Sequence, residues 1–205
     1  MKIDFPLNDD FASNFANAGR IAHELKAETD RGVVLVVAAF LDEQLEMLLT
    51  RHFIDDAKVA RELLSNNGPL ATFSSRIKLA YCLDLMHPEQ YSDLQIIRKI
   101  RNEFAHSHTP ADFSSDRVRD LCANLGFMHQ VPDLERKVDF STMFDEPETT
   151  RNQFIANALA LFCGLTNQIN MSTSGVIDAI RFVERDMRTT GGEHLQRLID
   201  EFDAQ

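Results

Sequence analysis

The stretch LQIIRKIRNEFAHSHTP, residues 94–110, decides the fold, because it reads as one helix with two different faces. At a period of 3.6 residues, an apolar face that should point into the core is formed by Ile96, Ile97, Ile100 and Phe104. A second face, about 150° away by helical geometry, carries Arg98, Arg101, Asn102, Ala105 and His106. A solvated face would normally carry Glu, Lys and Gln, so we interpret this second face as the candidate site.

The end of this helix adds two features to the candidate site. Ala105 is small and leaves room for another group to approach closely. Pro110 is expected to end the helix just past His108, because proline cannot continue the backbone hydrogen-bond ladder. Both His106 and His108 should therefore lie near the helix C-terminus.

The bulk composition indicates an ordinary globular protein. The chain has 205 residues, of which 44% are apolar and 26% charged, enough for one large domain with a real core. The formal charge of −11 argues against non-specific nucleic-acid binding, which depends on neutralising phosphates with Lys and Arg. A basic site on this acidic chain would have to be small and local.

Cysteine usage and hydropathy point to the cytoplasm. The three cysteines, Cys82, Cys122 and Cys163, are odd in number and far apart, which is typical of reduced and mostly buried thiols. The longest apolar run, residues 33–41, is well short of the roughly 20 residues that a bilayer requires. The first residues, MKIDFPLNDD, do not resemble a secretion signal. We therefore expect a soluble cytoplasmic protein with no membrane association.

The rest of the chain also follows helical patterns. A first helix should run from Asn8, Asp9 or Asp10 to about residue 28, and a second from Thr29 or Asp30 to Phe53. A β-strand is the rival interpretation for Val33–Val37, because β-branched residues favour strands. Further helices are expected over 57–65, 70–86, from Pro88 through the central stretch, and over 114–126 with Ser114 or Ser115 as N-cap and Gly126 as the stop.

The C-terminal part is expected to contain an irregular loop over 127–147, then a long helix from Thr149 or Thr150 through Ile169. A final pair of helical segments, SGVIDAIRFVERDM and EHLQRLIDEF, should follow. No repeat or linker divides the chain. We predict a single all-α domain over 1–205, a bundle of about seven to eight helices, with the helices of about 148–203 packed on the core.

Two sequence blocks resemble a known family. The first is R-N-x-x-A-H, formed by Arg101, Asn102, Ala105 and His106. The second lies upstream and consists of Gly68, Pro69, Leu70, Ser75, Arg76, Ile77, Lys78, Leu79 and Tyr81. Together they resemble the mannitol-repressor family, over about residues 30–125. This family falls within the broad class of helical domains called HEPN, whose mark is R-x(4–6)-H at the end of a core helix, so the resemblance implies a HEPN-like core.

The resemblance implies one of two roles. A mannitol-repressor-like regulator would act through protein contacts, with no DNA-binding motif of its own and with a homodimer as the expected assembly. The alternative is a metal-independent HEPN-type ribonuclease, in which two motif helices meet across a dimer. There His106 would move the proton, Arg101 would stabilise the phosphorane and Asn102 would orient either group. RNA would be the partner only under this alternative, which the net charge disfavours.

An acidic stripe on the second helix offers partners for these cations. Asp42, Glu43 and Glu46 lie beside the apolar run. This stripe is either a solvated face or one side of an internal ion pair with Arg76 or Arg101. If the protein is a regulator, Arg101 could pair with Glu43 or Glu46. The sequence leaves these choices open. We include Arg76, Arg98, Ala105, His108, Glu43 and Glu46 as candidate interaction residues.

The sequence argues against a metal site and against direct DNA binding. Glu103 and His106 form a Glu-x-x-His pair, but a di-iron bundle needs a second such pair, which the sequence lacks, so we expect no metal and no cofactor. Residues 61–81 come closest to a helix-turn-helix, with 66–69 as the turn. The helix that follows offers only Arg76 and Lys78, so direct DNA binding is not expected.

Overall fold

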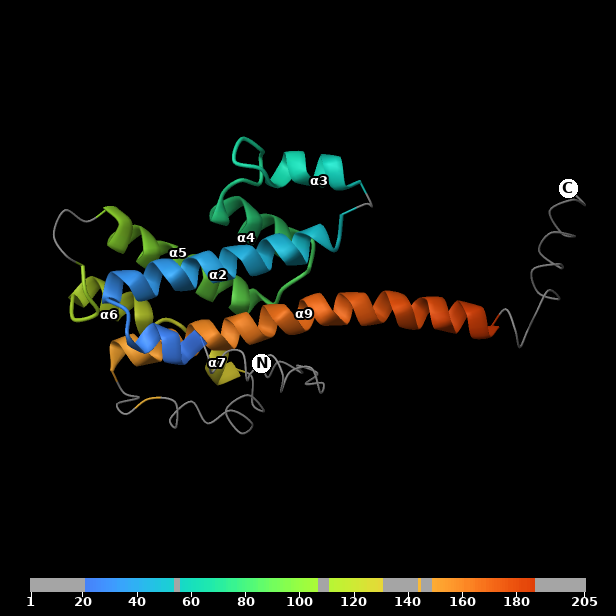
Figure 1. Cartoon of the computed structure of the whole chain (residues 1–205). Helices are drawn as coiled ribbons and strands as arrows, with labels where there is room; N and C mark the ends of the chain where they lie inside the picture. The colour runs from blue at the N-terminus through green and yellow to red at the C-terminus, as the bar shows by residue number, and fades with distance from the viewer. Residues whose placement is uncertain (1–20, 54–55, 107–110, 131–143, 145–148, 187–205) are drawn as a thin grey trace, which may run out of the picture. The chain divides into compact units, whose positions relative to one another are not determined.

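The computed structural model (Figure 1) describes residues 21–53, 56–106, 111–130, 144 and 149–186, with only the backbone described for 106, 130 and 171–186. Every regular element in these ranges is a helix, which confirms the predicted all-α class. The seven helices are α2 (Asp30–Thr50), α3 (Ala57–Leu64), α4 (Phe73–Cys82), α5 (Pro88–His106), α6 (Asp116–Cys122), α7 (Phe127–Gln130) and α9 (Thr150–Asp186). Residues 21–26 are also helical, and the rest of the predicted first helix lies outside the described residues.

The chain divides into two compact units, residues 1–169 and 170–205. All the side-chain contacts described below belong to the first unit. The packing of about 148–203 on the core stays a prediction. None of the helices in the described ranges combines the length and the apolar character needed to cross a bilayer.

The second predicted helix is α2, and it is buried in the middle of the first unit. Thr29 caps it by accepting a hydrogen bond from the Gly32 N–H at 3.1 Å. Val33, Val34 and Val37 are almost completely buried, so the helical interpretation of this run was right and the strand interpretation wrong. The helix ends at Thr50 instead of Phe53. Figure 1 shows α4 and the first part of α9 on opposite sides of α2, which therefore forms the centre of the unit.

The apolar face of the central helix α5 lies in the core as predicted. Ile97 and Ile100 are fully buried, Phe104 is 2% exposed and Ile96 is 9% exposed. Burying an aliphatic or aromatic side chain of this size stabilises a fold by roughly 1.5–3 kcal/mol. These side chains therefore fix the rotation of α5 about its axis. The polar face of the same helix is turned away from the core as a consequence.

The segment after α6 differs from the prediction. Ser115 is the N-cap of α6, but its side chain makes no capping bond, and the Asp112 carboxylate instead accepts from the Ser114 and Ser115 N–H groups. The helix ends at Cys122, short of Gly126. The predicted loop was wrong at its start, because α7 begins at Phe127. Its first N–H groups are capped by Asp93, which accepts from the Phe127 N–H at 2.9 Å across 34 residues of sequence.

The long C-terminal helix was also mispredicted in its extent. The sequence indicated a break between Ile169 and Ser174, yet α9 continues to Asp186. Its first half is anchored to the rest of the first unit by polar pairs between half-buried side chains of α9 and buried ones of α2 and α5. Thr166 donates to Gln44 of α2 at 3.0 Å, and the Gln168 amide donates to Gln90 of α5 at 2.8 Å. The predicted segment 193–202 lies outside the described residues.

Candidate functional site

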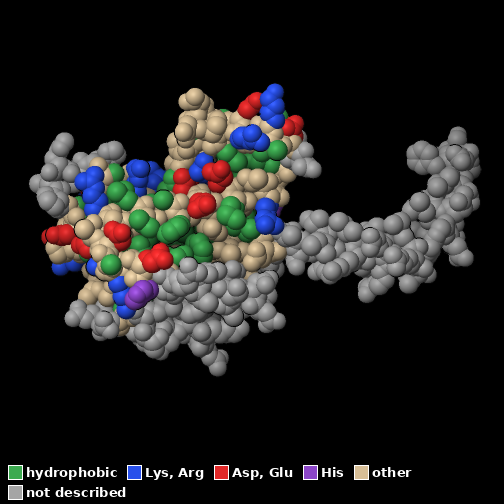
Figure 2. Space-filling view, in the orientation of Figure 1, with side chains coloured by type: hydrophobic (Ala, Val, Ile, Leu, Met, Phe, Trp, Pro, Cys, Tyr) green, Lys and Arg blue, Asp and Glu red, His purple; other side chains and the backbone are tan. Residues whose placement is uncertain are grey.

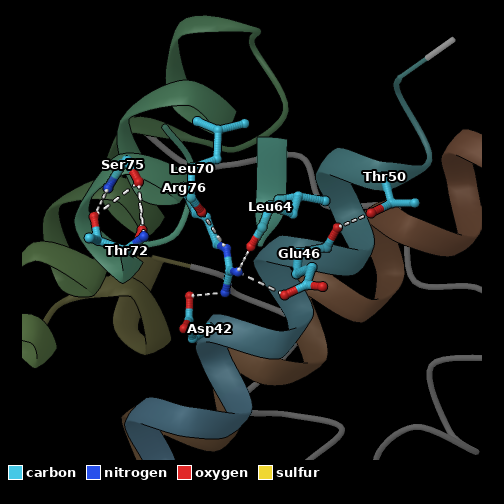
Figure 3. Close-up of polar contacts among 8 residues, drawn as sticks. All are labelled: Asp42, Glu46, Thr50, Leu64, Leu70, Thr72, Ser75 and Arg76. Atoms are coloured by element: carbon cyan, nitrogen blue, oxygen red, sulfur yellow. Dashed lines mark hydrogen bonds and ion pairs between the residues drawn. The ribbon is translucent and has the colours of Figure 1, made fainter. Parts of the chain in front are cut away.

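A buried arginine organises the region around the candidate site. Arg76, on α4, is 7% exposed, and its guanidinium reaches two carboxylates of α2, with Nη1 2.8 Å from Asp42 Oδ1 and Nη2 2.9 Å from Glu46 Oε2 (Figure 3). The same group donates to two backbone carbonyls, from Nε to Leu70 at 3.0 Å and from Nη2 to Leu64 at 3.1 Å. One guanidinium therefore ties α4, the end of α3 and the following connection to α2, which suits its planar fork of five donors.

Residues 68–76 of the upstream sequence block contribute to the same set of contacts around Arg76. Leu70 supplies one of the carbonyls that Arg76 holds, and its N–H donates to the Leu63 carbonyl at 3.0 Å. Gly68 lies so close to α3 that a Cβ atom there would come within 2.3 Å of the carbonyl oxygens of Glu62 and Leu63. The glycine is required for this close approach of two backbones. Residues 68–76 thus form a structural unit.

The cation that pairs with the acidic stripe of α2 is Arg76. Asp42 and Glu46 pair with it, whereas Glu43 is exposed and has no ion pair among the described residues. The predicted pairing of Arg101 with Glu43 or Glu46 is wrong: within the described part of the chain, Arg101 forms no ion pair. The reason is geometric, because Arg76 enters from α4 and takes both carboxylates that face it.

The polar face of α5 lines a cleft between α2, α4 and α5. The cleft has a volume of about 590 Å³, within the range of small-molecule sites. Arg98, Arg101 and Asn102 line its α5 side. Small and apolar residues line the α2 side, namely Leu35, Ala38 and Ala39, with Asp42 among them. The start of α4 closes the third side with Ala71, Thr72, Phe73 and Ser74.

Among the described residues, the two guanidiniums in the cleft have no charged partner, unlike Arg76. Arg98 Nε donates to the Gln95 side chain at 3.1 Å, and Arg101 Nη1 donates to Asn102 Oδ1 at 3.2 Å. Arg98 is half-buried and Arg101 is exposed. The carboxylate in the cleft, Asp42, is already paired with Arg76. Within the described part of the chain, these two positive charges in the cleft are therefore not compensated by a carboxylate.

The N-terminus of α4 adds hydrogen-bond donors at the edge of the cleft. Thr72 and Ser75 form a capping box, in which Thr72 Oγ1 accepts from the Ser75 N–H at 3.1 Å and Ser75 Oγ from the Thr72 N–H at 3.3 Å. The N–H groups of Phe73 and Ser74 belong to the first turn, where the helix itself provides no acceptor. The positive end of the α4 dipole thus lies beside Arg98 and Arg101.

The remaining predicted site residues are placed only in part. Ala105 is half-buried, and its carbonyl oxygen lies 3.5 Å from Arg31 Nη2, so this end of α5 faces the start of α2. The backbone of α5 is helical as far as His106, whose side chain lies outside the described residues, as does the whole of His108. The structure brings Arg98, Arg101 and Asn102 together, and the predicted partnership of Arg101 with His106 stays a prediction.

The sequence did not indicate which residues face Arg98 and Arg101 across the cleft. Thr72, Phe73 and Ser74 were missed, although Thr72 stands three residues before Ser75 in a capping pattern that marks the start of a helix. Ala38 and Ala39 lie within an apolar run and carry no signal of their own. Long-range packing of α2 against α4 and α5 decides these neighbours.

Comparison with known proteins agrees with this arrangement. The family model described as "Mannitol repressor" matches residues 19–169, a span that includes the structural unit of residues 68–76 and the cleft. The chain belongs to the mannitol repressor family. The match ends where the first compact unit ends.

Curated relatives carry the same description. The mannitol operon repressors of Escherichia coli strains K12 and O6:H1 are each 30% identical over 104 residues, which is 48% of this chain and 53% of theirs. The chain therefore spans about half the length of the curated relatives it matches.

Two solved structures share the fold. A chain from the X-ray structure of the MtlR-HPr complex of Escherichia coli matches with a TM-score of 0.57 at 20% identity, covering 73% of this chain and 98% of that one. A possible transcriptional regulator, YggD from Shigella flexneri, matches with a TM-score of 0.51 at 17% identity, covering 76% and 98%. These matches support the helical architecture of the first unit.

Proposed function

We propose that this chain is a transcriptional regulator of the mannitol-repressor type that acts through protein–protein contacts, with an HPr protein as its partner. The family match over residues 19–169 carries the proposal. The partner is suggested by the structural relative, which was solved as the MtlR-HPr complex. Cytoplasmic location and a homodimeric state are parts of the same proposal. The names of the relatives refer to regulators and to no nuclease, so the ribonuclease alternative gains no support.

The charge distribution supports protein contacts over DNA contacts. The net charge is −11, which opposes approach to a phosphate backbone. On the face drawn in Figure 2, basic and acidic side chains are interspersed with hydrophobic ones over α2, and no continuous basic stripe is visible there. Arg76, one of the two cations expected to read DNA in the helix-turn-helix interpretation, is buried in ion pairs. That interpretation loses half of its basic side chains.

Exposed apolar side chains at the end of α4 are the candidate contact surface. Tyr81 is 39% exposed and Leu83 is 46% exposed, only two positions apart in sequence. The Tyr81 ring stacks on Tyr91 of α5 with centroids 4.3 Å apart, so it is held in place. Rigid aromatic side chains with an exposed face are enriched in protein interfaces. We expect Tyr81 and Leu83 to contact the partner.

The test is calorimetric titration of the full chain with HPr from the same organism, together with light scattering to measure the mass of the free protein. Stoichiometric binding that weakens about tenfold in Leu83→Ala, and is unchanged in the control Val59→Ala, supports the proposal. Val59 is similarly exposed but lies on α3. No binding of HPr, combined with tight binding of duplex DNA at about 0.15 M salt, would instead establish direct DNA recognition.

A further inference from the structure

We propose that the cleft between α2, α4 and α5 binds a small phosphomonoester, which makes it an effector site separate from the protein-contact surface. The inference goes beyond the proposed regulatory function, since it depends on the cleft alone. It is carried by two guanidiniums that have no charged partner among the described residues, by a helix N-terminus that lines the same cleft, and by a cavity of small-molecule size.

Charge is the first argument. Arg98 and Arg101 lie one helical turn apart on the same face of α5, and both line the cleft. Their only described side-chain partners are neutral amides of Gln95 and Asn102. Asp42 would repel an anion if it were free, but Arg76 Nη1 lies 2.8 Å from its carboxylate. Two positive charges in one cavity bind a ligand with two negative charges more strongly than they bind a ligand with a single carboxylate.

Hydrogen-bond geometry is the second argument. Phe73 and Ser74, in the first turn of α4, line the cleft together with Arg98 and Arg101, and the helix itself provides no acceptor for their N–H groups. The Ser74 hydroxyl has no partner among the described residues. A helix N-terminus favours phosphate through these free donors and through its dipole. A phosphate monoester has three peripheral oxygens. It can therefore accept hydrogen bonds from guanidiniums on one side and from N–H groups on the other. A carboxylate has only two oxygens, both in one plane, and can satisfy fewer of these donors.

The remaining lining defines the rest of the ligand. Ala38 and Ala39 form a low wall on α2, and Phe73 provides an apolar surface next to the phosphate donors. A volume of about 590 Å³ leaves space for an organic group attached to the phosphate, and it is too small to admit a duplex nucleic acid. Asn102 offers an amide to a hydroxyl of that group. The fitting class is therefore a small, hydroxylated phosphomonoester.

The test is calorimetric titration of the full chain with inorganic phosphate and with glycerol phosphate, against sodium chloride at matched ionic strength. Saturable binding of both phosphates is expected, tighter for glycerol phosphate. Arg98→Gln and Arg101→Gln should each weaken binding by about tenfold or more. Arg119→Gln removes the same charge from α6, outside the cleft lining, and should leave binding unchanged.

A variant that alters shape without altering charge completes the test. Ala39 is exposed on α2 and lines the cleft, so Ala39→Leu fills the cavity while keeping a good helix former. It should abolish binding of glycerol phosphate and leave the circular dichroism and melting temperature within about 2 °C of the native values. Absence of saturable binding by the native chain overturns the proposal, and so does equal weakening by Arg119→Gln or binding that Ala39→Leu leaves intact.

Discussion

Replacement of Arg76 by Met tests whether this arginine holds the first unit together. Met fills a similar volume but removes four polar contacts, two to carboxylates and two to the carbonyls of Leu64 and Leu70. Removing one partner of a buried ion pair typically costs about 3–5 kcal/mol. The side chains of Asp42 and Glu46 are 29% and 46% exposed, so water compensates for part of the loss, most of all at Glu46.

The expected loss can be divided among the contacts. Each carbonyl that loses its charged donor contributes about 1 kcal/mol. The Asp42 pair contributes about 1.5 kcal/mol and the more exposed Glu46 pair about 0.5 kcal/mol. We therefore expect Arg76→Met to lower the free energy of unfolding by about 4 kcal/mol. In the background Asp42→Asn/Glu46→Gln, where no carboxylate is left unpaired, the same substitution should cost only about 2 kcal/mol.

The assay is urea unfolding followed by circular dichroism, with the slope compared between variants to confirm two-state behaviour. Lys78→Met is the matched control, because Lys78 is exposed on the same helix and the same charge is removed. It should change stability by less than about 0.5 kcal/mol. A loss in Arg76→Met no larger than that in Lys78→Met, or an equal loss in the two backgrounds, would refute the role assigned to this guanidinium.

Three further predictions concern the same unit. Gly68→Ala should destabilise the protein by about 2 kcal/mol or more, because the added Cβ meets backbone carbonyls at 2.3 Å. In the control Gly32→Ala the added Cβ meets only side-chain atoms, the flexible end of Glu28 and the Thr29 hydroxyl at 3.2 Å, so the loss measured by urea unfolding should stay below about 1 kcal/mol. Burial raises the pKa of the Asp93 carboxyl above its ordinary value of 3.8. The folded state thus binds this proton more tightly than the unfolded state does. The free energy of unfolding of the native protein, compared with that of Asp93→Asn, should therefore fall as pH rises from the unfolded-state pKa of Asp93 to its higher folded-state pKa, which a series of unfolding curves at different pH would measure. A thiol reagent at about pH 8 should modify the exposed Cys82 in the native protein and reach the buried Cys122 and Cys163 only after unfolding, since burial raises the pKa of both thiols to about 12.

The local patterns of the sequence predicted most of the helices. The 3.6-residue period placed Ile97, Ile100 and Phe104 in the core, and Thr29 marked the start of α2. Both signals depend only on neighbours within a turn or two of helix, which is why they can be read from one sequence. The cleft face of α5 followed from the same period once its apolar face was known.

The features that the sequence did not reveal depend on contacts between distant segments. The short helix α7 begins where Asp93 accepts the Gly126 and Phe127 N–H groups, and nothing near residue 127 announces that partner. The sequence left open which arginine would take the acidic stripe, because Arg76 and Arg101 both lie on helices that could face α2. The helix α9 continues through Ser172 and Gly175 although both residues have low helix propensity, because the propensity of a single residue changes the free energy of a helix only slightly.

The central claim is that Arg76 is a structural guanidinium, whereas Arg98 and Arg101 are available to a ligand. Nuclear magnetic resonance of the arginine Nε–Hε groups, recorded with and without inorganic phosphate, tests it most directly. We expect the Arg76 signal to exchange slowly with water and to stay unchanged, because the Arg76 side chain is buried and its Nε–H is bonded to the Leu70 carbonyl. The Arg98 and Arg101 signals should shift with phosphate. Rapid exchange of the Arg76 Nε–H, or a phosphate shift at Arg76 without one at Arg98 and Arg101, would contradict the account.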